Sequence, residues 1–185
     1  MAETPSNMLP LGTKAPNFKL FDTVTNQTVS LDALKSETAT VIMFICNHCP
    51  YVKHIQHKIV EIAKKYQAKA CSFVAINSND IKNYPADSPD KMKQEAEKNH
   101  YSFPYLYDET QEIAKAFMAA CTPDFYIFDG GLSCVYRGRF DEATPGNNKL
   151  VTGKDLTDAL DAILAGKNVN EDQKPSVGCN IKWKK

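Results

Sequence analysis

The chain has no excess of charge of either sign and no long hydrophobic run. Its 22 basic and 22 acidic residues cancel over 185 positions, which gives no electrostatic reason to expect a nucleic acid or an anionic membrane as a partner. The longest apolar run, 41–46, is far shorter than the roughly 20 residues that cross a bilayer. The N-terminus carries Glu3 and two prolines before any apolar stretch, unlike a secretory signal. We therefore expect a soluble, cytoplasmic protein that binds neither nucleic acid nor membranes.

The chain also lacks repeats, low-complexity tracts and any linker long enough to separate two domains. Apolar residues make up 43% and charged residues 24% of the chain, within the range of globular proteins. A length of 185 residues is typical of one domain. We predict a flexible N-terminus over residues 1–11, one domain over 12–167 and a C-terminal tail over 168–185.

Between these termini, strand and helix patterns alternate. Strands are expected at 17–24, 28–34, 39–45, 71–76, 125–129 and 134–140, with hairpins across 25–27 and across Gly130-Gly131. Helices are expected at 52–66, 88–99, 108–119 and 152–166, from apolar residues at three- and four-residue steps and from capping residues. This order predicts an α/β fold with a mixed central sheet flanked by helices and an N-terminal β-hairpin.

Six cysteines are more than packing requires, and only Cys46 and Cys49 are close together. In a reducing compartment this spacing indicates redox chemistry or a metal site. The pair follows a predicted buried strand and precedes a predicted helix, which would place the Cys46 sulfur beside the unpaired N–H groups of the helix N-terminus. We expect Cys46 to be the more exposed and more acidic thiol, with Cys49 able to attack a mixed disulfide formed at Cys46.

His48 lies directly before Cys49. When protonated it can stabilise a neighbouring thiolate, and a stabilised reduced form makes a dithiol couple more oxidising. The alternative is a solvated loop residue. His54 and His57 are interpreted as polar positions on the exposed side of the following helix rather than as metal ligands.

Three segments resemble the redoxin branch of the thioredoxin superfamily, in a peroxiredoxin-like subgroup related to alkyl hydroperoxide reductases. Residues 12–18 resemble its opening G-x-x-A-P-x-F segment, and Cys46-Asn-His-Cys49-Pro50 occupies its active-site loop. Thr122-Pro123, before a predicted strand, resembles the loop that holds the superfamily's cis-proline. The resemblance extends over residues 12–183 and implies a thioredoxin fold with a helix–strand insertion and no organic cofactor.

The resemblance also implies a thiol–disulfide oxidoreductase. Cys46 would attack protein or small-molecule disulfides, Cys49 would resolve the mixed disulfide, and a thiol donor would supply electrons. Thr122 and Pro123 would line the groove where a substrate chain lies. Two features depart from thioredoxin proper. Ile45 stands where thioredoxin has tryptophan, and the strand at 39–45 contains no buried acid, so proton handling is expected from His48 or solvent.

Two alternatives stay open. A thiol peroxidase would use a P-x-x-x-T-x-x-C segment and an activating arginine. Neither cysteine register supplies the segment, and Arg137 and Arg139 are interpreted as exposed charges on a strand. A Cu(I)-binding protein would combine the two cysteines, which are soft ligands, with a distant histidine. The only distant candidate is His100, and no metal-site spacing surrounds it.

The remaining cysteines carry separate expectations. Cys121 is either a buried hydrophobic residue or a secondary thiol that pairs on oxidation. Cys71 and Cys134 fall in strand patterns and are expected in the core. Cys179 lies in the polar tail, where it could act as an additional resolving thiol, within the chain or across a dimer. The oligomeric state is not predicted.

Overall fold

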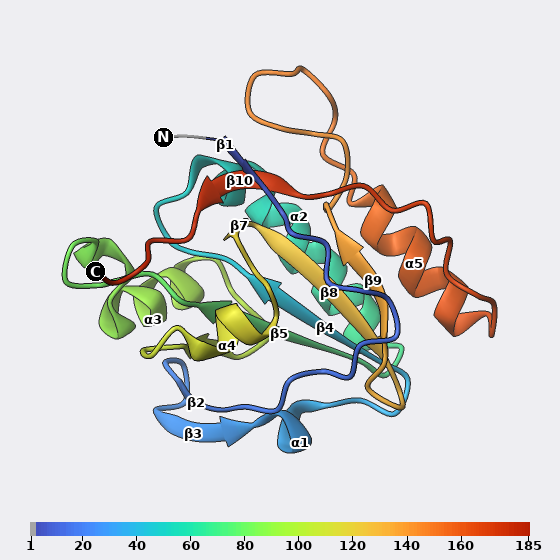
Figure 1. Cartoon of the computed structure of the whole chain (residues 1–185), viewed down its shortest axis with the longest axis horizontal. Coiled ribbons are helices and arrows are strands. Elements are labelled where there is room, and N and C mark those ends of the chain that lie inside the picture. The colour runs from blue at the N-terminus through green and yellow to red at the C-terminus, as the bar shows by residue number, and fades with distance from the viewer. Residues whose placement is uncertain (1–2) are drawn as a thin grey trace.

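The computed structural model describes residues 3–185 and is built around a mixed sheet of seven strands (Figure 1). The strand order is β3-β2-β6-β5-β4-β8-β9. Strand β4 pairs in parallel with β5, and β5 with β6, whereas the other neighbours are antiparallel. The predicted mixed sheet, the N-terminal hairpin β2–β3 and the hairpin β8–β9 are thus confirmed. The strand bounds are β2 Lys19–Asp22, β3 Gln27–Ser30, β4 Ala39–Phe44, β5 Cys71–Asn77, β6 Tyr105–Tyr107, β8 Asp124–Asp129 and β9 Cys134–Gly138.

A second, three-stranded sheet joins both ends of the described chain to the centre. Strand β10 (Val177–Asn180) lies between β1 (Glu3–Pro5) and β7 (Cys121–Thr122), antiparallel to both. In Figure 1 the red β10 runs beside the dark-blue β1, above β7. Sequence patterns suggested a flexible N-terminus and a separate tail, but residues 3–5 and 177–180 are paired strands of the fold. Residues 1 and 2 lie outside the described residues.

Helices cover both faces of the large sheet. Side chains of α2, α3 and α5 pack in one buried cluster, and those of α1 and α4 pack in a second cluster on the opposite face. Among residues 3–185, no helix is both long and apolar enough to cross a membrane. The helix bounds are α1 Leu31–Leu34, α2 Pro50–Gln67, η1 Pro85–Asp87 (a 3₁₀ turn), α3 Pro89–Lys98, α4 Glu112–Ala116 and α5 Lys154–Leu164.

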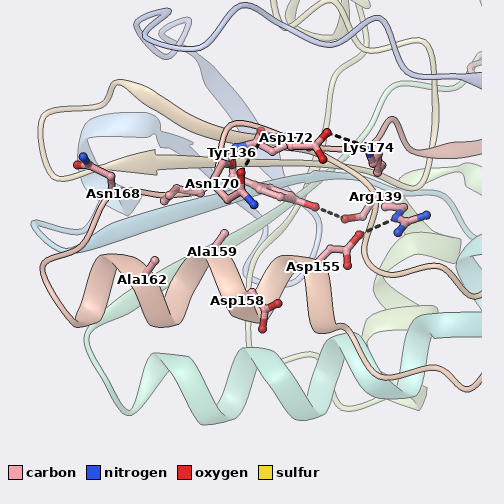
Figure 2. Close-up of a pocket in the computed structure, with 12 residues that line it drawn as sticks. Tyr136, Arg139, Asp155, Asp158, Ala159, Ala162, Asn168, Asn170, Asp172 and Lys174 are labelled. Carbon is pink, nitrogen blue, oxygen red and sulfur yellow. Dashed lines mark hydrogen bonds and ion pairs between the residues drawn. The ribbon is translucent and has the colours of Figure 1, made fainter.

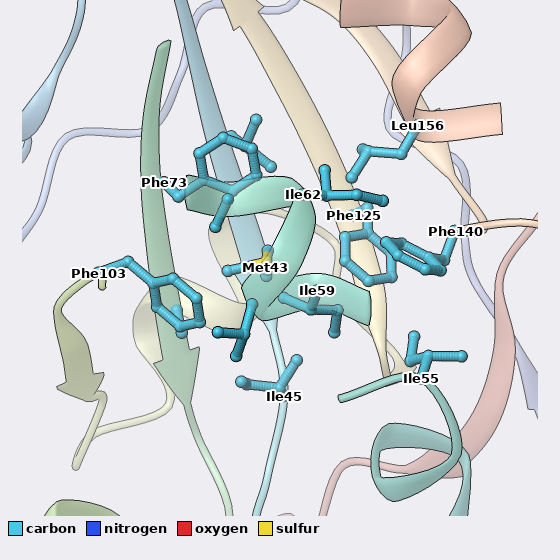
Figure 3. Packing of buried hydrophobic residues seen from close by; sticks show 14 of the residues in the cluster. Met43, Ile45, Ile55, Ile59, Ile62, Phe73, Phe103, Phe125, Phe140 and Leu156 are labelled. Atoms are coloured by element: carbon cyan, nitrogen blue, oxygen red, sulfur yellow. The ribbon is translucent and has the colours of Figure 1, made fainter. Parts of the chain in front are cut away.

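Strand β4 delivers the chain to the site because it is buried on both faces. All six of its residues are buried, and alternate side chains enter the two clusters. Met43 and Ile45 share one buried cluster with Ile55 and Ile59 of α2 (Figure 3). Each such side chain contributes about 1.5–3 kcal/mol on burial. This packing fixes the end of β4 against the start of α2.

Two predicted elements differ in the structure. Residues 31–34 form α1 rather than a strand, because the Ser30 hydroxyl accepts a hydrogen bond from the Ala33 N–H and caps a helical turn. The helix predicted from residue 108 begins at Glu112, because Gln111 adopts a left-handed φ of 64°. The Asp108 carboxylate still caps it by accepting the Ala114 N–H at 2.9 Å.

Candidate active site

The cysteine pair lies at the junction between β4 and α2, as the sequence predicts. Both side chains are buried, with 3% of Cys46 and 0% of Cys49 exposed, and the two thiols lie close enough that each shifts the pKa of the other. Helix α2, however, begins at Pro50, so the residue at its N-cap is Cys49 rather than Cys46. Cys49 is therefore the thiol that meets the free N–H groups of the first helical turn.

The contact between the two thiols shifts their pKa values in opposite directions. The hydrogen bond from Cys46 is the largest cause that lowers the pKa of Cys49 to about 5; burial opposes it, and hydrogen bonds from the Cys179 thiol and the Val52 N–H add to it. The same contact and burial raise the pKa of Cys46. These directions are opposite to the expectation that Cys46 is the more acidic thiol, an expectation that placed Cys46 rather than Cys49 at the start of the helix.

The Thr122-Pro123 segment faces both sulfurs. Its peptide bond is cis, as the resemblance implied. The Thr122 hydroxyl lies 3.4 Å from the Cys46 sulfur, and the Cys49 thiol donates to the Thr122 carbonyl oxygen at 3.2 Å. The backbone edge of Thr122 is paired with β10, so the chain's own tail lies where the resemblance implied a substrate chain.

Asp87 holds the active-site loop by accepting hydrogen bonds from it. It is fully buried, and its carboxylate accepts hydrogen bonds from the Asn47 N–H at 2.7 Å, from His48 Nδ1 at 2.6 Å and from the Asn79 side chain at 2.9 Å. The Asn77 amide also donates to it, at 3.2 Å. Burial opposes ionisation of Asp87, but the hydrogen bonds from His48, Asn79 and Asn47 outweigh it and lower the pKa of the carboxyl.

His48 is held by this carboxylate and by an aromatic neighbour. Its ring stacks on Tyr84, with centroids 5.6 Å apart and planes 9° from parallel. One atom each of Cys46, His48 and Asp87 lie within 4.8 Å of one another. The His48–Asp87 pair thus lies next to the Cys46 sulfur, in a fold whose β4 strand carries no acid.

Comparison with known proteins agrees with this geometry. Residues 11–134 match the family described as AhpC/TSA. The chain belongs to the AhpC/TSA family. Membership of this family supports a redox function. A search of curated protein sequences finds no match.

Two solved structures resemble this AhpC/TSA protein over nearly its whole length. An uncharacterised conserved protein from Geobacillus kaustophilus is 59% identical, with 100% of this chain and 97% of that chain covered and a TM-score of 0.98. A hypothetical protein from Sinorhizobium meliloti 1021 is 44% identical, with 98% of each chain covered and a TM-score of 0.95. The thioredoxin domain of a thiol-disulfide oxidoreductase from Bacteroides vulgatus is 14% identical, covers 74% of this chain and 91% of its own, and has a TM-score of 0.60. That last likeness shows the thioredoxin fold.

The other cysteines of this AhpC/TSA protein divide into two groups. Cys179 is buried in one cluster with Cys46 and Cys49 and is paired with Thr122, so the tail cysteine belongs to the site. Cys121 lies near the site, but its thiol points to the Pro123 carbonyl oxygen at 3.7 Å, and burial raises its pKa. Cys71 and Cys134 are buried in the strands β5 and β9, as predicted.

A metal ion would have to displace existing contacts. Among the described residues, Cys46, His48 and Asp87 form the group with metal-ligand spacing, and the distant candidate His100 is not part of it. The Asp87 oxygens already accept four hydrogen bonds, one of them from His48. Asp87 is therefore better suited to ordering the loop than to ligating Cu(I), because Cu(I) prefers sulfur ligands.

Other polar features lie apart from the site. The two arginines bond elsewhere: Arg137 to the Leu9 carbonyl oxygen and to Gln173, and Arg139 to Asp155. Figure 2 shows a pocket of about 330 Å³ that Arg139 and Asp155 help to line, together with α5 and residues 168–174; neither active-site cysteine lines it.

Sequence reasoning missed Asp87, although a signal was present. Asn77 ends the buried strand β5, and Ser78, Asn79 and Asp80 follow it directly. The carboxyl ends of the parallel strands β4 and β5 lie at one edge of the sheet, so these polar side chains are bound to lie near Cys46. Buried amides of this kind require an acceptor, and Asp87 is that acceptor.

Proposed function

We propose that this protein is a thiol–disulfide oxidoreductase that cycles between two thiols and a Cys46–Cys49 disulfide. The observation that carries the proposal is the contact between the two sulfurs at the N-terminus of α2, beside cis-Pro123. This position favours thiolate, which is the nucleophile of disulfide exchange.

Cys46 attacks first, as the resemblance implies, and 3% of this residue is exposed against 0% of Cys49. A proton passes from Cys46 to Cys49 within their hydrogen bond, and the Cys46 thiolate attacks one sulfur of the substrate disulfide. The other substrate sulfur leaves as a thiolate and takes up a proton. Cys49 then loses its proton, which its cap position favours, attacks Cys46 and releases the second substrate thiol. Two electrons have moved from the cysteine pair to the substrate.

His48 and Asp87 position the loop during these steps. A thiol donor reduces the Cys46–Cys49 disulfide again by the reverse exchange. Disulfides of small molecules or of protein segments that reach Cys46 without pairing along Thr122 fit the site, because β10 occupies that edge. A compartment that keeps thiols reduced, such as the cytoplasm, suits six free cysteines.

Single cysteine variants test the proposal. Disulfide reductase and peroxidase rates are measured side by side for wild type, Cys46→Ser and Cys49→Ser, with Cys71→Ser as a matched control at the far end of β5. We expect Cys46→Ser to lose turnover, Cys49→Ser to accumulate a mixed disulfide with substrate and Cys71→Ser to keep wild-type rates. Equal reductase rates in all four proteins would contradict the proposal. A peroxidase rate far above the reductase rate would favour the peroxidase alternative.

A further inference from the structure

The C-terminal strand places a third cysteine next to the pair. In the antiparallel pairing of β10 with β7, Cys179 lies opposite Thr122, the residue before cis-Pro123. The Cys179 side chain is 3% exposed and lies in the same buried cluster as Cys49, whose thiol donates to the Thr122 carbonyl oxygen, and Cys49 and Cys179 each shift the pKa of the other. Cys49 therefore contacts two other cysteines, Cys46 from its own loop and Cys179 from the tail.

Gly178 permits this close approach. A Cβ atom at this position would overlap the carbonyl oxygen of Thr122 and lie 3.2 Å from the Pro123 ring. The absence of a side chain lets β10 lie directly against the cis-proline segment. The neighbouring Cys179 is therefore buried close to the Cys49 sulfur.

The tail is anchored on both sides of Cys179. Before it, the Ser6 N–H donates to the Ser176 carbonyl oxygen at 2.8 Å. After it, the Ile181 N–H donates to the Ala120 carbonyl oxygen at 3.0 Å, and the Lys182 N–H donates to the Asn79 side chain at 2.8 Å. Ile181 is itself buried in the second core cluster. Cys179 is thus held at Cys49 by the fold.

We propose that Cys179 is a third redox thiol, which attacks the Cys46–Cys49 disulfide at the Cys49 sulfur and moves the disulfide to Cys49–Cys179. The inference rests on the proposed function, because that cycle supplies the Cys46–Cys49 disulfide. In the exchange Cys179 loses a proton, the Cys49–Cys179 bond forms and the Cys46–Cys49 bond breaks. Cys46 leaves as a thiolate and takes up the proton, so no net oxidation occurs. The oxidising equivalent is stored between α2 and β10, and Cys46 is free again.

The exchange has a defined pH dependence. Burial, followed by the hydrogen bond to Cys49, raises the pKa of the Cys179 thiol to about 12, against an opposing effect of Lys182. Only a small fraction of Cys179 is ionised at neutral pH, and that fraction grows tenfold for each pH unit below the pKa. When Cys46 and Cys49 form a disulfide, burial still raises the pKa of the Cys179 thiol. The exchange rate is therefore expected to rise by roughly tenfold per unit between pH 7 and pH 9.

Peptide mapping of the full chain reads the exchange directly. Reduced protein is oxidised with glutathione disulfide, quenched in acid over a time course, alkylated and digested with trypsin. Cys46 and Cys49 share the tryptic peptide 36–53, and Cys179 lies in the peptide 168–182. We expect an internal disulfide in 36–53 first, then a cross-link between 36–53 and 168–182 that forms faster at pH 9 than at pH 7. Sequencing of the cross-linked peptide should place the bond at Cys49.

Variants separate the possible outcomes. In Cys46→Ser the cross-link should form directly, in Cys49→Ser and Cys179→Ser it should be lost, and Cys71→Ser should behave as wild type. An internal disulfide with no cross-link up to pH 9 overturns the inference and leaves the proposed function intact. A cross-link that joins two copies of the chain, or that uses Cys46, also overturns it. Absence of the internal disulfide at every time point overturns both.

Discussion

Replacement of Asp87 by asparagine tests how the site is held together. The Asp87→Asn substitution keeps the shape of the side chain but places an NH2 group where one carboxylate oxygen accepted two hydrogen bonds. Two of the four donors lose their acceptor, and hydrogen bonds to charged groups contribute about 1.5–3 kcal/mol each. Removal of a buried charge recovers part of this loss. We expect Asp87→Asn to reduce the free energy of unfolding by about 2–4 kcal/mol.

Urea unfolding measures this loss. With a slope of about 2 kcal/mol per molar urea, the midpoint should fall by about 1–2 M. Asp90→Asn, an exposed change in the first turn of α3, is the control and should stay within about 0.5 kcal/mol of wild type. The pKa of Asp87 is lowered by the fold, so its stabilisation is present above the unfolded pKa of about 3.9. The difference between wild type and Asp87→Asn should be constant from pH 5 to 7 and shrink as the pH falls below 4.

A second readout separates the effect of charge from simple loosening. The negative charge of Asp87 raises the pKa of Cys46, after the larger effects of Cys49 and burial. Asp87→Asn should therefore speed alkylation of Cys46 near pH 7 while Cys71 is unaffected. An unchanged urea midpoint together with unchanged Cys46 labelling would refute the assignment of Asp87 as the anchor of the loop. Equal acceleration at Cys46 and Cys71 would mean general loosening instead.

Two further changes probe the cis-proline segment. Burial raises the pKa of Asp124 to about 8, and only the Tyr126 hydroxyl and a backbone N–H oppose this. Between pH 4 and 8 the folded protein keeps a proton on Asp124 that the unfolded chain loses, so the free energy of unfolding of the wild type should fall as the pH rises. Asp124→Asn should remove this pH dependence of the urea midpoint. The same pH dependence in both proteins would contradict the raised pKa of Asp124. Gly178→Ala should displace β10 from Thr122 and speed alkylation of the buried site cysteines at least several-fold. Gly131→Ala, whose Cβ would meet ordinary contacts, should not do so, and equal rates in the two variants would count against the close packing.

The cysteine pair could be placed from the sequence because its signals are local. An apolar run followed by three- and four-residue periodicity defines β4 and α2, and the pair lies between them. The order of acidity could not be derived in the same way. It depends on the contact between the two buried thiols, which only the tertiary structure supplies, and on which of them is the cap residue, and helix ends are the least certain part of a pattern.

The role of Asp87 and the strand β10 could not be predicted from the sequence, because their partners are distant along the chain. The donors to Asp87 come from the loop after β4 and from the end of β5 and the segment that follows it, so no single window contains the set. Strand β10 consists of Val-Gly-Cys-Asn, which shows no alternating pattern and contains two residues that disfavour strands. Its position is set by pairing with β1 and β7, which only the tertiary structure supplies.

The two disulfides that Cys49 can form differ in what they do to the fold. A Cys46–Cys49 bond closes a loop of a few residues, whereas a Cys49–Cys179 bond closes a loop of about 130 residues. In the chain-entropy account, these loops restrict the unfolded state by about 2 and about 5 kcal/mol, respectively. Because β10 is also paired with β1, the longer loop fixes both ends of the described chain at the site. The exchange at Cys49 therefore couples the redox state of the loop to the stability of the whole fold, by about 3 kcal/mol in favour of the tail-bonded form.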